Sequence, residues 1–230
     1  MHFAGGNSFS FQFMKPWLPE FEFLPLELPG RGRRPREPLI RNFETAAADI
    51  HRQIKSLLKP GRFLIYGHSM GATLALKVAG LLEKEQQSPV QLIVTGNPGP
   101  GVKENKKRHL MEKQVFRDEL KEIGGIPELV LESEEMLEFF EPILRADFEV
   151  IEKEEEMVLA PIRAPIYAMM GSEEDQVEAI GDWKNFTQSG FTSTILEGNH
   201  FFIHRHAAQI AEIIRTRYRN SIASHLITDK

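Results

Sequence analysis

The stretch Phe63–Ala79, FLIYGHSMGATLALKVA, joins a short apolar run to a helix rich in alanine and leucine through a tight turn. Its first four residues predict a buried strand that stops at Gly67, and the later spacing predicts a helix over Met70–Glu85. Between them stands the pattern Gly-x-Ser-x-Gly around Ser69. In this setting the pattern is typical of a strained turn that lifts a serine hydroxyl clear of a sheet.

Ser69 is therefore a candidate nucleophile. A serine in such a turn lies at the positive end of the following helix. The backbone N–H of Met70 then points to the place where an oxyanion would form. The alternative is a glycine-rich turn that holds a serine by chance. The neighbouring His68 is a poor candidate base because adjacent side chains diverge on a tight turn, and we expect it to pack or hydrogen-bond locally.

A serine hydroxyl is a poor nucleophile at neutral pH and needs a base. Among the eight histidines, His200 has the best context, since it stands late in the chain in a short loop between a predicted strand at 191–196 and the last helix. The alternative is a helix N-terminal residue without a role. His204 and His206 follow at a spacing that suggests a metal, but no carboxylate or cysteine cluster completes such a site, so we expect no metal.

Acidic residues stand between the serine and the histidine in the chain, just past a predicted strand at 165–170. This strand ends in Gly171-Ser172-Glu173-Glu174-Asp175. One of the three acids is expected to orient the histidine, and the other two are expected to be solvated. Asp175 is the usual residue type for this role, and Glu174 could also serve, since some serine hydrolases use glutamate.

Strands and helices alternate at both ends of the chain, which is typical of an α/β protein with a mostly parallel sheet covered by helices on both faces. Further elements are predicted at 42–58 (helix), 90–95 (strand), 177–188 (helix) and 204–219 (helix). The alternation EFEFLPLE predicts another strand over Glu20–Glu27. The charged, helical segment at about 103–156 is interpreted as an insertion on one face, so that residues 1–230 form a single domain.

The composition is that of an ordinary globular protein. Of 230 residues, 28 are Lys or Arg and 33 are Asp or Glu, which gives a net charge of −5. Such a mildly acidic chain lacks the electrostatic footprint of a general nucleic-acid binder. The absence of cysteine excludes disulfides and a cysteine nucleophile. No apolar run approaches the roughly 20 residues that span a bilayer, and no secretory signal is visible. We therefore expect a soluble cytoplasmic protein without a membrane partner.

Several short motifs match one known family. They are Phe3-Ala4-Gly5-Gly6, Leu28-Pro29-Gly30-Arg31-Gly32, Gly67-His68-Ser69-Met70-Gly71, Gly124-Gly125-Ile126-Pro127, Leu144-Arg145-Ala146-Asp147-Phe148 and Gly198-Asn199-His200-Phe201-Phe202. Together they resemble the type II thioesterases, the stand-alone editing thioesterases of nonribosomal peptide and polyketide synthesis, over essentially the whole chain. The resemblance implies an α/β-hydrolase fold in which the insertion at about 103–156 is a helical lid.

Transferred residue by residue, the resemblance implies that Ser69 is the nucleophile and His200 the base. It also implies that the backbone N–H groups of Met70 and Ala4 form the oxyanion hole. The family usually has a full strand before the Ala-Gly-Gly element, whereas only a few residues precede Ala4 here.

The acid departs from the family pattern. The family usually has Gly-x-x-Asp after the penultimate strand, and the residue three after Gly171 is here Glu174. Asp175 stands one position further on. We choose Asp175 as the triad acid on residue type and keep Glu174 as the alternative.

The implied substrate is an acyl thioester on the phosphopantetheine arm of an acyl or peptidyl carrier protein, processed through an acyl-enzyme by a monomer that needs no cofactor. Apolar residues at helical spacing in the lid would line an acyl chamber or pack the lid onto the body. They are Leu110, Met111, Phe116, Leu120, Leu137, Phe140 and Leu144. The basic run Arg31–Arg36 is expected to be solvated, with contact to a phosphate or an acidic carrier protein as the alternative. Asp147 is expected to be structural, paired with Arg145 or a helix end.

Two other functions remain open on the sequence. A serine hydrolase of small esters or amides would share the fold and the triad, because function resides in the site and not in the scaffold. A hydrolase-like binding module is the third possibility, although it would have no need of a serine, a histidine and an acid together. The lid motifs and the Leu-Pro-Gly-Arg element favour the carrier-protein thioesterase.

Overall fold

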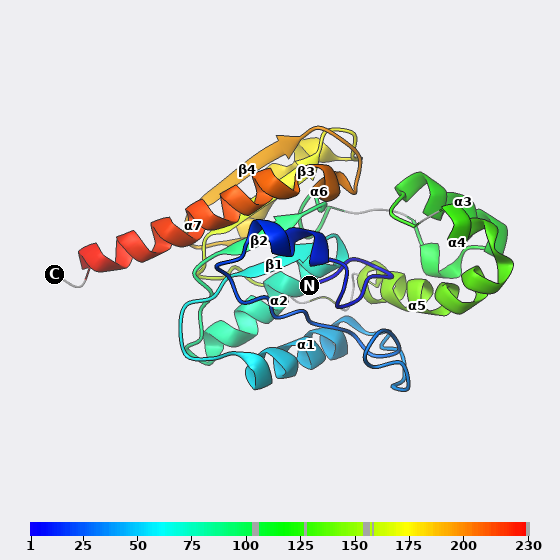
Figure 1. Cartoon of the computed structure of the whole chain (residues 1–230), viewed down its shortest axis with the longest axis horizontal. Helices are drawn as coiled ribbons and strands as arrows, with labels where there is room; N and C mark the ends of the chain where they lie inside the picture. The colour runs from blue at the N-terminus through cyan, green and yellow to red at the C-terminus, as the bar shows by residue number, and fades with distance from the viewer. Residues whose placement is uncertain (103–105, 127, 154–156, 158, 229–230) are drawn as a thin grey trace.

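A sheet of four parallel strands forms the centre of the described part of the protein (Figure 1). The computed structural model describes residues 1–102, 106–126, 128–153, 157 and 159–228. In spatial order the strands are β1 (Ile65–His68), β2 (Leu92–Thr95), β3 (Ile166–Gly171) and β4 (Phe191–Leu196). Each strand pairs in parallel with the next, so the predicted parallel sheet is confirmed.

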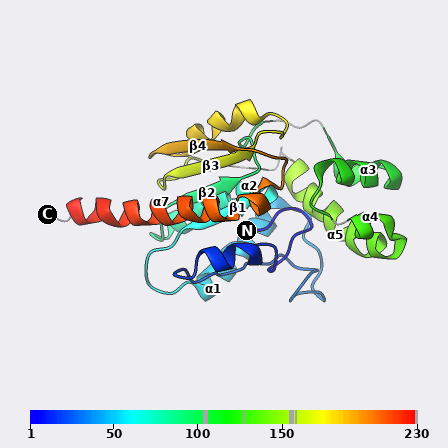
Figure 2. The same cartoon turned by 45° about the horizontal axis from the view of Figure 1, so that its top comes forward.

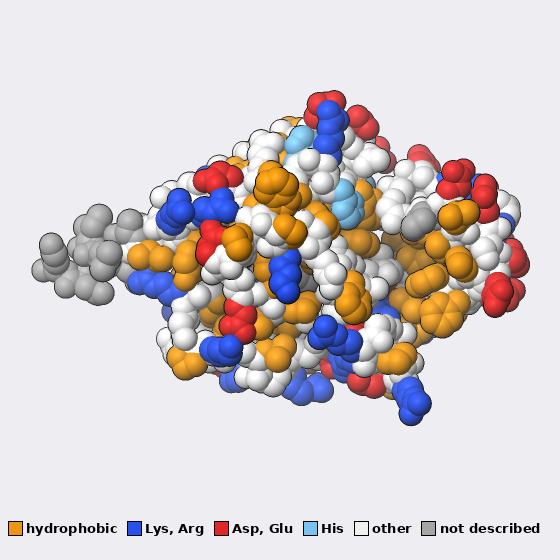
Figure 3. Space-filling model, in the orientation of Figure 1, with side chains coloured by type: hydrophobic (Ala, Val, Ile, Leu, Met, Phe, Trp, Pro, Cys, Tyr) orange, Lys and Arg blue, Asp and Glu red, His pale blue; other side chains and the backbone are white. Residues whose placement is uncertain are grey.

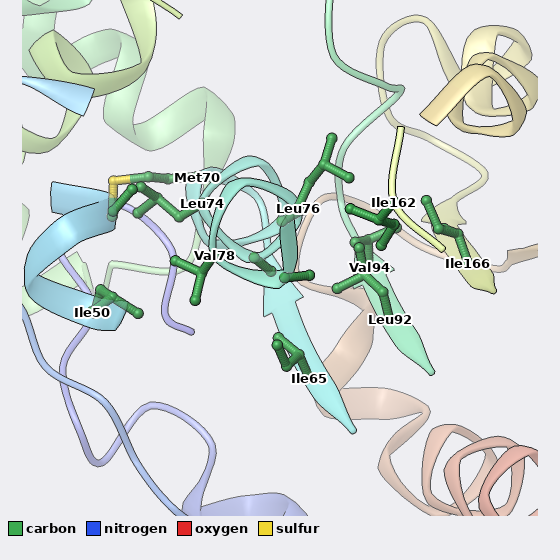
Figure 4. Close-up of a cluster of buried hydrophobic side chains, with 14 of the residues drawn as sticks. Ile50, Ile65, Met70, Leu74, Leu76, Val78, Leu92, Val94, Ile162 and Ile166 are labelled. Carbon is green, nitrogen blue, oxygen red and sulfur yellow. The ribbon is translucent and has the colours of Figure 1, made fainter. Parts of the chain in front are cut away.

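Helices α1 (Phe43–Leu57) and α2 (Met70–Lys84) pack on one face of the sheet in the main core (Figure 4). Helix α1 begins as predicted, because the side chain of Asn42 accepts a hydrogen bond from the backbone N–H of Thr45. Helix α2 is buried on most of its surface. The 3-10 helix η4 (Val177–Phe186) adds the fully buried Trp183 to the same core.

The opposite face of the sheet carries a second core. It is covered by the 3-10 helix η1 (Gln12–Trp17) and by helices α6 (Phe202–Arg205) and α7 (Ala207–Thr228). Because side chains alternate along a strand, Ile93 and Met169 join this second core while Val94 and Ala168 join the main one. Helices on both faces are thus confirmed. Figures 1 and 2 show α7 running along the sheet and projecting beyond it.

The insertion between β2 and β3 is mostly helical in its described residues, as predicted. It contains η2 (Arg108–Leu110), α3 (Lys113–Ile123), α4 (Glu128–Glu132) and α5 (Glu134–Glu152). We call these the lid helices, and both views show α3, α4 and α5 together at one end of the sheet (Figures 1 and 2). Residues 103–105 and 154–156, at the predicted ends of the insertion, and residue 127 of the Gly-Gly-x-Pro motif lie outside the described residues.

The lid helices have an apolar cluster of their own. Six predicted residues of the apolar face belong to it or pack against it, namely Met111, Phe116, Leu120, Leu137, Phe140 and Leu144. Leu110 departs from the prediction, since 68% of its surface is exposed. Near the end of α5, Val150 joins the main core, so this helix links the lid to the body. No described helix combines the length and the apolar character needed to cross a membrane.

Residues 20–27 do not form the predicted strand. Pro25 lacks the N–H that a ladder requires. The backbone of Glu27 bonds to a side chain, since its N–H donates to Oε1 of Gln53 (3.1 Å) and its carbonyl accepts from Nε2 of Gln53 (2.9 Å). The alternation of the sequence has another cause: Phe21 packs against the second core and Leu26 belongs to the main core.

The first residues of the chain lie along the free edge of β1. The backbone nitrogen of Met1 donates to the carbonyl of Tyr66 (2.5 Å), and the N–H of His68 donates to the carbonyl of Met1 (3.3 Å). This is one step of a parallel ladder. It places the following turn, Phe3–Gly6, beside the start of α2.

Two glycines of α2 give a test of this packing. An alanine methyl at Gly71 would lie 2.3 Å from the carbonyl oxygen of Met1, whereas at Gly80 the nearest atom would be 3.7 Å away. We predict that Gly71→Ala lowers the free energy of unfolding by about 1–3 kcal/mol through overpacking. Gly80→Ala should raise it by about 0.5–1 kcal/mol, because alanine favours the helix. Urea unfolding measures both, and a loss of equal size in the two variants would contradict the packing.

Candidate active site

Ser69 stands in a strained turn between β1 and α2. Its backbone has φ 56° and ψ −121°, a conformation that non-glycine residues rarely adopt. The turn is tight because the neighbouring backbone is in contact: a methyl at Gly67 would lie 2.1 Å from the carbonyl oxygen of Gly71. The N–H of Ser69 donates to the carbonyl of Thr95 at the end of β2 (2.8 Å). Ser69 is half-buried, and its hydroxyl makes no capping hydrogen bond to α2, so Oγ is available to act as a nucleophile.

His200 stands in the loop between β4 and α6, as predicted. Its Nδ1 donates to Oε2 of Glu174 at 2.6 Å, and the side chains of the two residues are 22% and 6% exposed. The other carboxylate oxygen of Glu174 accepts from the N–H of Gly171 (2.7 Å). The acid is thus fixed by the backbone at the end of β3, and Nδ1 of the histidine is committed to it. Nε2 is left as the nitrogen that can take a proton.

The choice of Asp175 as the acid is not supported. The structure places the alternative, Glu174, against the histidine, whereas Asp175 and Glu173 are exposed. The physical reason is the tight turn after β3, in which the N–H of Glu174 donates to the carbonyl of Gly171 (3.2 Å). That turn directs the third residue after the glycine toward the histidine, and the longer glutamate side chain is accommodated there. Spacing would have been a better guide than residue type.

His68 lies under the catalytic candidates and is fully buried. Its Nδ1 is 2.9 Å from Oγ1 of Thr95, and its ring centre is 4.9 Å from that of His200. Burial, and to a lesser extent the charges of His200 and His204, hold the pKa of His68 well below its usual range. It is therefore neutral at physiological pH. It packs against His200 and bonds to the neighbouring strand β2, 27 residues away in the chain.

A large cavity of about 1580 Å³ opens between the lid helices and the ends of the strands. Ser69, His200 and Glu174 line it, together with Met70 and Ala4, the two residues predicted to donate to an oxyanion. Apolar side chains of the lid line the rest, among them Leu120, Leu137, Phe140, Leu144 and Phe148. Figure 3 shows hydrophobic side chains gathered around the hollow between the lid helices and the body.

The basic run after the Leu-Pro-Gly element is only partly solvated. Arg33 and Arg36 are exposed as expected, but Arg31 is buried and forms a bidentate ion pair with Asp147 of α5. The predicted pairing of Asp147 with Arg145 is wrong, since Arg145 pairs with Glu141 one turn earlier in the same helix. Nothing in the local sequence pointed to a contact across 116 residues.

His204 and His206 do not join His200 in a metal site. Nε2 of His206 lies 2.8 Å from the carbonyl of Glu197, and the ring of His204 packs against Phe13. Within the part of the chain that the structure describes, no group of three or more His, Cys, Asp or Glu side chains is arranged to hold a metal ion.

The parallel sheet, the strained serine turn and the cavity at the strand ends define an enzyme of the α/β-hydrolase fold. A family model of the thioesterase domain matches residues 1–218. The gramicidin S biosynthesis protein GrsT of Aneurinibacillus migulanus is 30% identical over an alignment of 227 positions that covers 96% of this chain and 88% of that protein. Thioesterase PikA5 of Streptomyces venezuelae is 26% identical over an alignment of 232 positions that covers 100% of this chain and 80% of that protein.

The solved structures include a similar protein. The type II thioesterase BorB from the borrelidin biosynthetic cluster superposes with a TM-score of 0.85 at 26% identity, over 94% of this chain and 89% of that chain. The chain belongs to the thioesterase family. The resemblance to type II thioesterases and the α/β-hydrolase fold are thereby confirmed.

The two neighbouring acids give a matched test of the site. We predict that Glu174→Gln lowers kcat by a factor on the order of 10⁴, because an amide cannot stabilise the imidazolium that forms at His200. Asp175→Asn, a change of the same kind at an exposed position, should alter kcat by less than about threefold. Steady-state hydrolysis of an acyl thioester measures both. Small and equal losses would show that another residue orients the histidine.

Proposed function

We propose that this protein hydrolyses acyl thioesters held on the phosphopantetheine arm of acyl or peptidyl carrier proteins, and so clears such carriers in nonribosomal peptide or polyketide synthesis. Ser69 is the nucleophile, His200 the base and Glu174 the acid that orients it. The observation that carries the proposal is the Glu174–His200 hydrogen bond at a cavity that the strained Ser69 also lines. Membership of the thioesterase family and the pathway names of the relatives support it.

The reaction proceeds by acyl transfer to serine and then to water. Oγ of Ser69 attacks the thioester carbonyl while Nε2 of His200 takes its proton. The tetrahedral intermediate collapses, the C–S bond breaks, and the imidazolium returns the proton to the leaving pantetheine sulfur. A water molecule, deprotonated by the same nitrogen, then attacks the acyl-enzyme. The bond between the acyl carbon and Oγ of Ser69 breaks, the imidazolium returns the proton to Oγ, and the carboxylic acid is released. Glu174 keeps Nδ1 protonated and stabilises the imidazolium in both steps.

The oxyanion of each intermediate is stabilised by the backbone N–H groups of Met70 and Ala4. Met70 is the first residue of α2, where N–H groups are free of intrahelical partners and the helix dipole is positive. Ala4 belongs to the turn Phe3–Gly6, which lies beside the start of α2. Ala4 and Met70 both line the cavity with Ser69. Preorganised donors of this kind are usually the largest single contribution to acyl transfer.

The lid helices, within about 103–156, form the acyl chamber. The cavity of about 1580 Å³ is larger than the 300–1,000 Å³ that a typical small-ligand site needs. It has room for an acyl chain beside the pantetheine arm, which favours a carrier-bound substrate over a small ester. We also propose, from the family resemblance, that the protein acts as a monomer in the cytoplasm.

Three reactions test the proposed function. Ser69→Ala should lower acyl release from a carrier protein by several orders of magnitude while the fold stays intact, because the hydroxyl is not part of the core. A serine-reactive fluorophosphonate should label the wild type and not the variant, and failure to label would indicate a binding module. If a soluble p-nitrophenyl ester were turned over well and the acyl carrier protein not at all, the protein would be a small-ester hydrolase.

Two adjacent phenylalanines on α5 test the chamber. Phe140 lines the cavity, whereas Phe139 is 68% exposed and does not. We predict that Phe140→Ala shifts the preferred acyl chain length, seen as changed ratios of kcat/KM over a series of acyl carriers. One extra or missing methylene in a hydrophobic pocket is worth about 10- to 200-fold in such ratios. Phe139→Ala should leave the ratios unchanged, and equal profiles for both variants would contradict the chamber.

A further inference from the structure

A buried carboxylate of the lid is bonded to the turn that carries a proposed oxyanion donor. Oδ2 of Asp147, on α5, accepts the N–H of Gly5 at 2.8 Å. The same carboxylate is gripped by Arg31, whose Nη2 donates to Oδ1 at 2.7 Å and whose Nη1 donates to Oδ2. Asp147 is fully buried and the side chain of Arg31 is only 4% exposed. Three segments distant in sequence therefore meet at one carboxylate.

The turn that this carboxylate holds is sharply defined. Gly6 N–H donates to the carbonyl of Phe3 (2.9 Å), and Gly5 has φ +75°, which together are the signature of a type II turn with Ala4 at its second position. The orientation of the Ala4–Gly5 peptide distinguishes this turn from a type I turn. The N–H of that peptide is the group bonded to Asp147, so the carboxylate fixes the orientation.

Packing from the same helix confines the turn further. A methyl at Gly5 would lie 2.5 Å from Cδ2 of Leu144, one turn before Asp147 on α5. Ala4 packs against the apolar cluster of the lid, and Nη1 of Arg31 lies 3.4 Å from the carbonyl of Gly6. Helix α5 thus supplies both the steric wall and the acceptor that determine where the turn sits.

Stability alone does not explain a charge pair at this place. Removing two charges from water costs free energy that their attraction only roughly repays, and well-packed apolar residues are often as stable. An apolar pair could not accept the N–H of Gly5, whereas the carboxylate does. The role that distinguishes the ion pair from an apolar pair is therefore the hydrogen bond to the turn.

We propose that Asp147, paired with Arg31, is a positioning residue that fixes the Ala4 N–H for oxyanion stabilisation. This inference rests on the proposed function, in which Ala4 is an oxyanion donor. Asp147 does not touch the substrate's reacting atoms in this scheme; it acts through Gly5 on the neighbouring peptide. One carboxylate then links the proposed oxyanion donor to helix α5.

A pair of double variants tests the proposal. Removing only one partner would leave a buried charge unpaired and could unfold the protein. Arg31→Met is therefore combined with Asp147→Asn, which keeps an oxygen to accept from Gly5, or with Asp147→Leu, which has similar volume and no acceptor. With a p-nitrophenyl ester as substrate, we expect the leucine variant to lose about 10- to 100-fold in kcat with KM changed by less than about threefold. The asparagine variant should lose less than about tenfold.

Transition-state binding separates positioning from a merely structural role. A trifluoromethyl ketone that carries the acyl chain of the p-nitrophenyl ester forms an oxyanion when Ser69 adds to its carbonyl carbon. Its affinity should fall in the leucine variant by the same factor as kcat/KM, while the asparagine variant keeps most of it. Rates are referred to the concentration of active sites titrated with a fluorophosphonate. Equal kcat per active site in both variants, with equal affinity for the ketone, would overturn the proposal.

Two controls keep the result interpretable. Hydrogen exchange of the Gly5 amide in the wild type needs no variant: the bond predicts strong protection, and exchange at the rate of a free peptide would overturn the proposal even if both double variants failed to fold. The small ester makes the test independent of the carrier protein. Failure of the proposed function would instead appear as a wild type that does not turn over acyl carriers, or as a Ser69→Ala variant that stays active.

Discussion

The backbone contact across the serine turn is the constraint on which the rest of the site depends. Gly67 lies so close to the backbone of Gly71 that a methyl at Gly67 would be 2.1 Å from the carbonyl oxygen of Gly71, and this contact holds Ser69 in a conformation that costs about 1–3 kcal/mol. The strain is tolerated because the surroundings leave the turn no alternative. The N–H of Ser69 is bonded to the end of β2, and the carbonyl of Met1 fills the space against Gly71. Because Gly71 has no side chain, the first segment of the chain can lie directly against the turn that carries Ser69.

The other half of the site is held by a second backbone contact, between the loops that follow β3 and β4. A methyl at Gly171 would lie 2.4 Å from the carbonyl of Gly198, so these loops touch through their main chains. Glu174 leaves the first loop and His200 the second, and the closeness of the loops lets the two side chains meet at 2.6 Å. Because all four strands are parallel, their carboxyl ends lie at the same end of the sheet. The segments that follow β1, β3 and β4, which carry Ser69, Glu174 and His200, therefore line the same cavity.

Local sequence patterns predicted those parts of the protein that local physics determines. The strands, the serine turn and the loop position of His200 follow from apolar runs and glycines within a few residues. Residue type favoured Asp175 as the acid, whereas Glu174 keeps the distance from Gly171 that the family pattern shows and is the carboxylate bonded to His200. The pairing of Arg31 with Asp147 could not be predicted, since it joins residues 116 apart and the charged neighbour Arg145 offered a plausible local partner. The alternation at 20–27 was misleading because it reflects burial of side chains in two cores and not a ladder.

Helix α5 belongs to the body as much as to the lid, and this limits how the chamber can open. Near the end of α5, Val150 lies in the main core and Glu149 pairs with Arg41 (2.8 Å). Asp147 accepts a hydrogen bond from Gly5 in the turn Phe3–Gly6. A movement of the whole helix would expose an apolar core residue and break a fully buried ion pair, which is strongly unfavourable. Helices α3 and α4 pack in the cluster around Phe116 and Leu131, which also contains Leu144 and Phe148 of α5. Any opening of the chamber that keeps these contacts of α5 would therefore have to displace α3 and α4, and would also remove the packing of Ala4 against their cluster.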